Sequence, residues 1–338
     1  MQPSAPAHVE SLQDAFRWVE FNLGVLQREC SLDGIATRLR NTRLSTSFSG
    51  TGGAENALDA IVHGLRRFTP GGCSPPTNEF AVEWFDESRY ELRMLRNPPK
   101  HVFTDICDFI HPSFSQELKG AATNMSYESL RSLLTQRGKC LLEMSAFCVV
   151  CGKRCTATRC DVHVAGTPCV AWSRLGKREF ASGVTLLPFM IWVGMRRALQ
   201  ETCVLHENVQ DFDTGLFEEL LGDLYVVKTC ILNAAHFGQH TERVRRFTWL
   251  MHKTSFVQRL RNGTPLVDWD SRFVDKFRRE LRTTWSDLFE LASPEEILEE
   301  ARWAAARKGL APVAGTLTHA TNFEKLAARL RNALSASL

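Results

Sequence analysis

The feature that most constrains the fold of this 338-residue chain is a regular alternation of short apolar runs with amphipathic segments between residues 43 and 252. The apolar runs have the length of buried strands, and the segments between them repeat apolar residues at helical spacing, as in "ALDAIVHGLRRF". Strands that alternate with helices favour a doubly wound, mostly parallel α/β sheet. Ligands of such sheets bind at the carboxyl ends of the strands, so the residues after each strand are the first site candidates.

The remaining segments depart from this alternation and suggest the domain organisation. Residues 9–40 have helical spacing, and we expect 1–42 to form an N-terminal helical extension. Residues 43–255 are expected to form the main domain, interrupted by an insertion at about 107–159. Residues 256–338 are charged and mainly helical, which predicts a small helical C-terminal lobe.

Two classes of protein are disfavoured by the apolar segments. The N-terminus lacks a basic start followed by an apolar run, so a secreted protein is not expected. The longest apolar stretch, "VTLLPFMIWVGM", contains a proline and is shorter than the roughly 20 residues that a membrane span needs. We therefore expect a nuclear or cytoplasmic protein without a transmembrane segment, whose 11 cysteines stay reduced.

The positive charge of the chain is small in total but concentrated in one segment. The net charge is only +3, but residues 237–282 contain eleven Arg or Lys against five Asp or Glu. A basic stretch of this kind can track the phosphates of a nucleic acid. The alternative is an ordinary solvated helix face.

Chemically distinctive residues follow several of the expected strands. "FSGTGG" (48–53) is a glycine-rich turn before a helix, either a nucleotide-binding turn or simply a tight turn. "VEWFDES" places Glu83 at a strand end, where a carboxylate holds a ribose hydroxyl pair or caps a helix. "FTDI" places Asp105 after the next strand. "HVAGTPCVAWSRLG" (163–176) puts Cys169 on a loop, as a nucleophile or as one more buried thiol.

In this order, "FSGTGG", "EW", "TDI", "GTPCVAWS", "ENV" and "RVRRF" resemble the motifs of the cytosine-C5 methyltransferase family over residues 44–252. The family contains DNA methyltransferases and a tRNA-modifying branch. Glu207 of "ENV" follows Cys169 of "PC" by 38 residues, a spacing like that of compact members. The resemblance implies the Rossmann-like fold of class I S-adenosylmethionine-dependent methyltransferases.

The resemblance also implies how the chemistry is divided among side chains. Cytosine C5 is a poor nucleophile, and addition of a thiolate at C6 activates it, which is the role assigned to Cys169. An acid at N3 then donates a proton or a hydrogen bond, the role assigned to Glu207. The arginines that position the base and its phosphate are Arg243 and Arg245. The supporting residues are Pro168, Ser173 and Asn208.

S-adenosylmethionine is the methyl donor that the resemblance implies, and DNA with a flipped cytosine is the implied substrate, with RNA as the alternative. Along the methionine part of the donor it places Phe48, Gly50 and Gly52. Glu83 is assigned to the ribose and Trp84 to the face of the adenine. Asp105 and Ile106 are assigned to the adenine edge.

The chain departs from the family pattern in several places. "LSTS" precedes the glycine-rich turn where the family has an acid and apolar residues, and Thr241 stands where the family has glutamine. After residue 252 the usual target-recognition pattern is missing, so 256–338 is expected to hold only a reduced target-recognition region and a closing helix. The family's last motif is faint in "THATNFEKLAARL".

The expected insertion ends in four cysteines at the spacing C-x2-C-x3-C-x4-C. Four thiolates can bind zinc tetrahedrally, and the first pair has the usual zinc-ligand spacing. The alternative is a set of free thiols in a partly buried hairpin. The candidate ligands are Cys148, Cys151, Cys155 and Cys160.

Three functions remain in competition on the sequence alone. The first is an active DNA cytosine-C5 methyltransferase. The second is a methyltransferase of the tRNA type, since that branch is also compact. The third is a catalytically inactive relative that binds nucleic acid or a partner methyltransferase, which the faint last motif favours. Tests for a covalent adduct with 5-fluorocytosine oligonucleotides, in DNA and RNA forms, separate these three functions.

Overall fold

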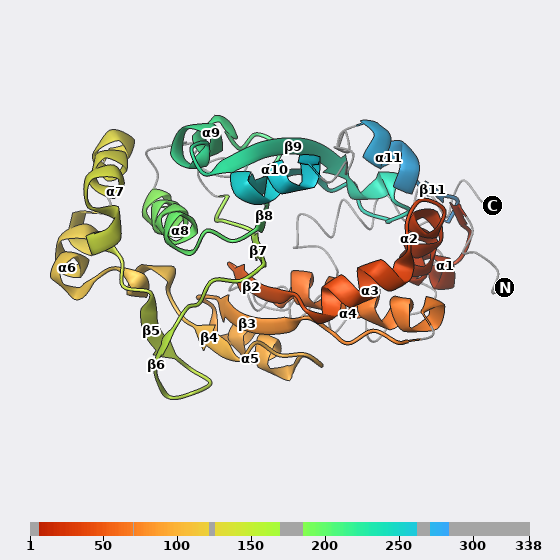
Figure 1. Cartoon of the computed structure of the whole chain (residues 1–338), viewed down its shortest axis with the longest axis horizontal. Coiled ribbons are helices and arrows are strands. Elements are labelled where there is room, and N and C mark those ends of the chain that lie inside the picture. The colour runs from red at the N-terminus through yellow and green to blue at the C-terminus, as the bar shows by residue number, and fades with distance from the viewer. Residues whose placement is uncertain (1–6, 70, 122–125, 170–184, 262–270, 284–338) are drawn as a thin grey trace, which may run out of the picture. The chain divides into compact units, whose positions relative to one another are not determined.

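The computed structural model describes residues 7–69, 71–121, 126–169, 185–261 and 271–283 (Figure 1). The chain divides into two compact units. The small unit comprises residues 1–21, 234–242 and 278–338, and the large unit comprises 22–233 and 243–277. All the candidate site residues that the structure describes belong to the large unit.

The large unit contains, within the described residues, a nine-stranded sheet whose five central strands run parallel (Figure 1). In spatial order these strands are β4 (His101–Phe103), β3 (Thr77–Val82), β2 (Arg43–Ser47), β7 (Val162–Ala165) and β8 (Cys203–Val209). The expected α/β fold with a mostly parallel central sheet is therefore confirmed.

Antiparallel strands extend the sheet at both edges. On one side β5 (Ser145–Cys148) pairs with β4, and β6 (Lys153–Thr156) pairs with β5. On the other side β10 (Val244–His252) lies between β8 and β9 (Tyr225–Asn233). Consequently β6 and β9 are the two edge strands of the sheet.

The order of the parallel strands reverses between β2 and β7. The chain moves outward from β2 through β3 to β4, and the second half moves outward in the opposite direction from β7 to β8. The loops that leave β2 and β7 therefore diverge, and a crevice at such a switch point is where doubly wound sheets bind ligands. The two loops start side by side, because the N–H of Gly166 donates to the carbonyl of Ser47 at 3.3 Å.

β2 is central in the sheet, yet its side chains Ser45, Thr46 and Ser47 are buried hydroxyls. Ser45 Oγ lies 2.8 Å from Nδ1 of the buried His163, and Trp192 donates its indole N–H to His163 Nε2 at 3.0 Å. Since Nε2 accepts, the neutral imidazole has its proton on Nδ1 and donates to Ser45. These hydrogen bonds compensate for the burial of Ser45 and His163 in the middle of the sheet.

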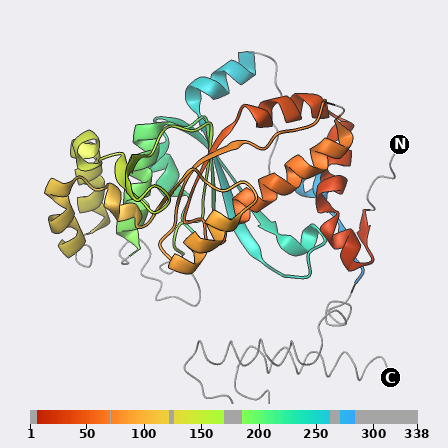
Figure 2. The same ribbon diagram turned by 90° about the horizontal axis from the view of Figure 1, so that it is seen from below.

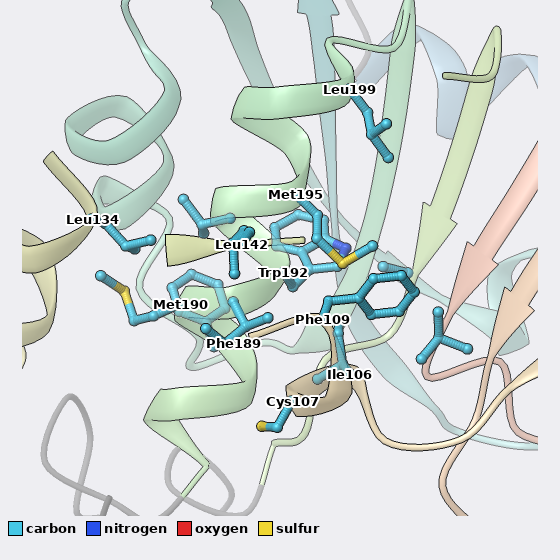
Figure 3. Packing of buried hydrophobic residues seen from close by; sticks show 14 of the residues in the cluster. Ile106, Cys107, Phe109, Leu134, Leu142, Phe189, Met190, Trp192, Met195 and Leu199 are labelled. Carbon is cyan, nitrogen blue, oxygen red and sulfur yellow. The ribbon is translucent and has the colours of Figure 1, made fainter. Parts of the chain in front are cut away.

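The main hydrophobic core surrounds α8 (Leu186–Leu199), which is apolar on nearly all sides. The side chains of Met190, Trp192 and Val193 have no exposed surface. Figure 3 shows Trp192 beside Phe109, which belongs to the 3-10 turn η1 (Ile106–Phe109). A helix that is apolar all round must be covered on every side.

The segment between β4 and β5 supplies part of that cover. It contains η1, α6 (Pro112–Ala121) and α7 (Tyr127–Leu141), and α7 contacts α8. In both ribbon views α6 and α7 lie beside α8 (Figure 1 and Figure 2). A Cβ built on Gly194 would lie 2.7 Å from Cδ1 of Leu142, so glycine allows this close approach.

Further helices of the large unit are α3 (Leu32–Arg40), α4 (Gly53–Phe68), α5 (Asp86–Met94), α9 (Gly215–Leu221), α10 (Lys253–Arg261) and α11 (Ser271–Phe277). The helix α2 (Trp18–Gln27) starts in the small unit and ends in the large one. In the described part of the chain, no helix combines the length and the apolar composition needed to cross a membrane.

In the small unit, β1 (His8–Val9) pairs in parallel with β11 (Glu280–Leu281), next to α1 (Leu12–Phe16) and the 3-10 turn η3 (Ala234–His236). Arg279 is buried, donates to the carbonyl of Asp14 at 2.9 Å and lies over the ring of Phe21. Its guanidinium thus bridges the strand pair and the first helices of this unit.

Candidate functional site

The glycine-rich turn after β2 has the backbone geometry of a close-approach loop. Phe48, Gly50 and Gly52 all have positive φ angles, of 55°, 54° and 84°. For Phe48 this conformation is unfavourable, and it is held by a 2.8 Å hydrogen bond from its N–H to the carbonyl of Val82 on β3. The turn ends at Gly53, where α4 begins, so the N–H groups of the first helical turn lie beside it.

Glu83, directly after β3, fixes this turn from the side. Its carboxylate is buried, with Oε2 accepting the N–H of Gly50 at 2.7 Å and Oε1 accepting the N–H of Phe85 at 2.9 Å. Each carboxylate oxygen has a second acceptor position. Glu83 therefore holds the turn and keeps acceptor capacity for a ligand hydroxyl.

Trp84 follows Glu83 and is 72% exposed, although indole is among the most apolar of side chains. Phe85 beside it is 65% exposed, with ring centroids 5.9 Å apart. Arg89 fixes the backbone here by donating to the carbonyls of Glu83 and Trp84. Exposed aromatic rings at a strand end are suited to packing on a planar ligand.

Asp105 and Ile106 follow β4 and differ in what they offer. Asp105 is the N-cap of η1, where its Oδ1 accepts the N–H of Cys107 at 2.8 Å. The side chain of Ile106 is 3% exposed and belongs to the hydrophobic core (Figure 3). At Ile106, therefore, only the backbone is available to hydrogen-bond the polar edge of a ligand.

The loop that leads to Cys169 is anchored by β8. Asn208 donates from Nδ2 to the carbonyl and to Oγ1 of Thr167, both at 3.1 Å. Oγ1 of Thr167 also lies 2.7 Å from Nε2 of the buried His206. Pro168 follows Thr167 directly, so the chain leaves a fixed point before it reaches Cys169, which is half-buried with a free thiol.

Glu207 lies on the neighbouring strand and forms an ion pair with Arg245 of β10. Arg245 Nε is 2.8 Å from Glu207 Oε1, and both side chains are partly exposed. Phe247 is the direct cross-strand partner of Glu207, so Arg245 reaches it diagonally. A Cβ built on Gly166 would lie 3.4 Å from Glu207 Oε2, which places this carboxylate against the start of the cysteine loop.

The two arginines assigned to the site are placed differently. Arg245 is inside β10 and paired with the acid, whereas Arg243 precedes the strand and its side chain is exposed. Arg246 faces away from this pair and donates from Nε to the carbonyl of Gln210. Ser173 lies outside the described residues, as does the segment with the faint last motif.

Sequence reasoning missed a second carboxyl beside the glycine-rich turn. Glu55 on α4 is buried and accepts a 2.6 Å hydrogen bond from Thr46 Oγ1. Burial raises the pKa of Glu55 above its usual value. The acid that the family carries on this strand is missing from β2, and Glu55 brings a carboxyl to the same strand from the helix. A glutamate three residues inside a helix looks like a surface residue in sequence, so no signal indicated its burial.

The four cysteines considered for zinc do not all lie together. Cys148, Cys151 and Cys155 gather at the β5–β6 hairpin, and the fourth ligand-type side chain beside them is His101 of β4. Cys160 is buried elsewhere, and burial raises the pKa of its thiol to about 11. His101 was missed because it stands 47 residues before Cys148, with no motif that links them.

Two buried histidines make stability depend on pH. Burial lowers the pKa of His206 to about 3 and that of His163 well below its usual value. In the unfolded chain both take up protons below about pH 6.5, so the folded state loses relative stability as the pH falls. Raised pKa values of the buried Glu55 and Glu201 act in the opposite direction.

The test is therefore a comparison with a variant. Below pH 6.5 the parent is expected to lose up to about 1.4 kcal/mol of unfolding free energy per pH unit more than His206→Gln. Urea unfolding of both proteins at about pH 7.5 and about pH 5 measures this difference. Equal losses in the two proteins would contradict a neutral, buried His206.

Residues 152–308 match the family model for C-5 cytosine-specific DNA methylase. The span includes Cys169, Glu207 and Arg245. It confirms the resemblance for the motifs "GTPCVAWS", "ENV" and "RVRRF", and the motifs of residues 48–106 lie before it. No curated protein sequence matches the chain.

Several solved structures resemble the chain weakly. They include the Dnmt2 methyltransferase of S. pombe, with 13% identity, a TM-score of 0.39, and coverage of 70% of this chain and 54% of that one. A DNMT2 mutant of Spodoptera frugiperda has 14% identity, a TM-score of 0.35, and coverage of 63% and 50%. The methyltransferase EhMeth of Entamoeba histolytica has 12% identity, a TM-score of 0.34, and coverage of 62% and 53%. The chain spans about half the length of these proteins.

Proposed function

We propose that this chain, whose residues 152–308 match the C-5 cytosine-specific DNA methylases, transfers a methyl group from S-adenosylmethionine to C5 of a cytosine in DNA. The observation that carries the proposal is the Glu207–Arg245 pair, which lies against the start of the cysteine loop at the switch point of the sheet. An acid on β8 and a thiol on the loop that follows the adjacent strand β7 are the two groups that C5 activation requires.

In this proposal Cys169 acts as the thiolate and forms a bond to C6 of the cytosine. Glu207 acts here as the protonated acid and gives its proton to N3, so that N3 takes up the electron density that would otherwise collect on the ring. Arg245 holds the carboxylate in place through its 2.8 Å ion pair. Once C5 carries the methyl group and S-adenosylhomocysteine is left as the by-product, a base would remove the C5 proton. The electron pair then restores the C5–C6 double bond, the Cys169 thiolate leaves C6, and N3 returns its proton to Glu207. The target base must be flipped out of its stack to reach these groups.

The residues around the switch point fit S-adenosylmethionine, which supplies the methyl group when bound. Phe48, Gly50 and Gly52 form the turn that would face its methionine part. The buried carboxylate of Glu83 would hold the ribose hydroxyls, and the exposed ring of Trp84 would cover the adenine. Asp105 and the backbone of Ile106 would meet the adenine edge.

The remaining assignments follow from the same proposal. Residues 43–255 would form the catalytic region, and 256–338 a reduced target-recognition region with a closing helix. Pro168, Ser173 and Asn208 would support the cysteine loop. Arg243 and the basic stretch of 237–282 would contact DNA phosphates. A nuclear or cytoplasmic location is consistent with the reduced thiols that this chemistry needs.

Gly52→Ala is expected to weaken S-adenosylmethionine binding about tenfold, because Gly52 has a φ of 84° and an added Cβ would lie 2.8 Å from Cδ1 of Leu95. Gly53→Ala is the matched control, since nothing lies within 4 Å of its added Cβ and its position is helical. Calorimetric titration measures both affinities, and thermal unfolding checks that each variant is folded. Unchanged affinity in Gly52→Ala would argue against the turn as the cofactor site.

Trapping tests the proposed reaction. The protein is incubated with S-adenosylmethionine and 5-fluorocytosine oligonucleotides in DNA and RNA forms, and a covalent adduct is sought on a denaturing gel. We expect an adduct with DNA. An adduct with RNA alone would move the assignment to the tRNA type, and no adduct with either would favour the inactive relative.

A further inference from the structure

Four metal-ligand side chains from three strands and one turn converge on one point at the β4 end of the sheet. His101 begins β4, Cys148 ends β5, Cys151 lies in the hairpin turn and Cys155 lies in β6. One ligand atom from each of the four lies within 4.8 Å of all the others. Figure 1 shows these strands side by side at one end of the sheet.

The distances within this cluster match those around a tetrahedral metal. Nδ1 of His101 lies 3.4 Å from Sγ of Cys151 and 3.7 Å from Sγ of Cys148. Zinc bonds of typical length at tetrahedral angles would separate a nitrogen and a sulfur ligand by about 3.6 Å. The three cysteines are free thiols, so a disulfide does not account for their convergence.

The backbone of the hairpin is shaped for this arrangement. Gly152, directly after Cys151, has a φ of 66°, and its N–H donates to the carbonyl of Cys148 at 2.9 Å. This turn brings the two ends of the C-x2-C segment to the same side. The positive φ favours glycine at this position, which is the first residue after the second cysteine.

The ligand set points to a structural zinc ion. Three thiolates and one imidazole form a Cys3His set, which is typical of zinc and too soft for magnesium or calcium. Four protein ligands fill a tetrahedral shell and leave no open position for a substrate, as in structural rather than catalytic sites. Cys148 is buried and Cys151 is exposed, so the cluster lies at the surface within reach of a metal from solvent.

The main-chain pairing of the hairpin with β4 is short. β5 pairs with β4 only at Cys148 and Phe103, reinforced by a hydrogen bond from the N–H of Val149 to the carbonyl of Val102. The side chains of β6 are mostly exposed. Ala146 and Cys148 of β5 are buried in the core, so the exposed strand β6 and the turn are the parts that a metal bound to β4 as well would fix.

We propose that His101, Cys148, Cys151 and Cys155 bind one zinc ion that fastens the β5–β6 hairpin to β4. This inference does not depend on methyl transfer, since none of the four proposed ligands is assigned a part in the reaction of Cys169 and Glu207. Its test reads metal content and not activity.

The full chain is purified without chelators in buffer with added zinc, and gel filtration removes loosely bound metal. Elemental mass spectrometry then measures the zinc content per chain. We expect one zinc per chain, released by a mercurial that blocks thiols. Cys151→Ser should reduce the zinc content at least severalfold. Cys30→Ser, which changes another exposed cysteine, should retain it.

Cobalt gives a second readout that needs no variant. When Co²⁺ replaces the zinc in the parent protein, a tetrahedral site with three thiolates gives strong thiolate-to-metal absorption in the near ultraviolet and intense visible bands. Parent protein without bound zinc and without these bands would overturn the proposal. So would full zinc content in a folded Cys151→Ser, Cys155→Ser double variant.

Discussion

Cys169→Ala is expected to abolish methyl transfer, with a loss of about a thousandfold or more, because without the thiolate C5 stays a poor nucleophile. S-adenosylmethionine binding should persist, since the proposed cofactor loops follow β2, β3 and β4 and the changed residue follows β7. Transfer of a labelled methyl group to duplex DNA under single-turnover conditions measures the first effect, and calorimetry the second.

Cys30→Ala is the control for this variant, because it removes an exposed thiol far along the chain from the β7 loop. It should transfer methyl groups like the parent. The covalent adduct with 5-fluorocytosine DNA should also vanish in Cys169→Ala and persist in the control. If Cys169→Ala retained turnover within tenfold of the parent, the nucleophile would have to be sought elsewhere.

Glu207→Gln is expected to lower kcat by about a hundredfold to ten-thousandfold, because an amide keeps the shape of the acid but cannot transfer a proton. The change also removes the charge that pairs with Arg245. DNA binding should change little. Glu218→Gln, an exposed acid on α9, is the control and should leave kcat unchanged.

A double-mutant cycle sharpens this prediction. If Arg245 acts by holding Glu207, the combined loss in Glu207→Gln with Arg245→Ala should be clearly smaller than the product of the two single losses. Arg246→Ala serves as the control arginine, because Arg246 donates to the Gln210 carbonyl and not to the acid. Fully multiplicative losses would show that Arg245 acts independently of Glu207.

The parallel part of the fold was predictable because alternating strands and helices have few ways to pack. The edges of the sheet were harder to predict, because the sequence of a strand such as β9 or β10 does not indicate whether it runs parallel or antiparallel to its neighbour. The antiparallel order β8, β10, β9 depends on pairing across the sheet rather than on any one segment.

For related reasons, the sequence motifs indicated some residues of the candidate site but not how the side chains pack and pair. Motif order indicated Cys169 and Glu207, but which arginine meets the acid depends on where β10 begins, at Val244. The burial of the Ile106 side chain follows from packing against α8 and has no counterpart in the motif. Likewise His101 joins the cysteines only through the pairing of β4 with β5.

The short strand β6 has a consequence for how the protein behaves at high concentration. An edge strand has unpaired backbone groups on its outer side and can template further strands from other molecules. At this edge the strand has four residues and carries the exposed cations Lys153 and Arg154, of which Arg154 pairs with Glu143. Like charges would face each other if two such edges met. Sheet-to-sheet polymerisation from this end is therefore disfavoured by the sequence of β6 itself.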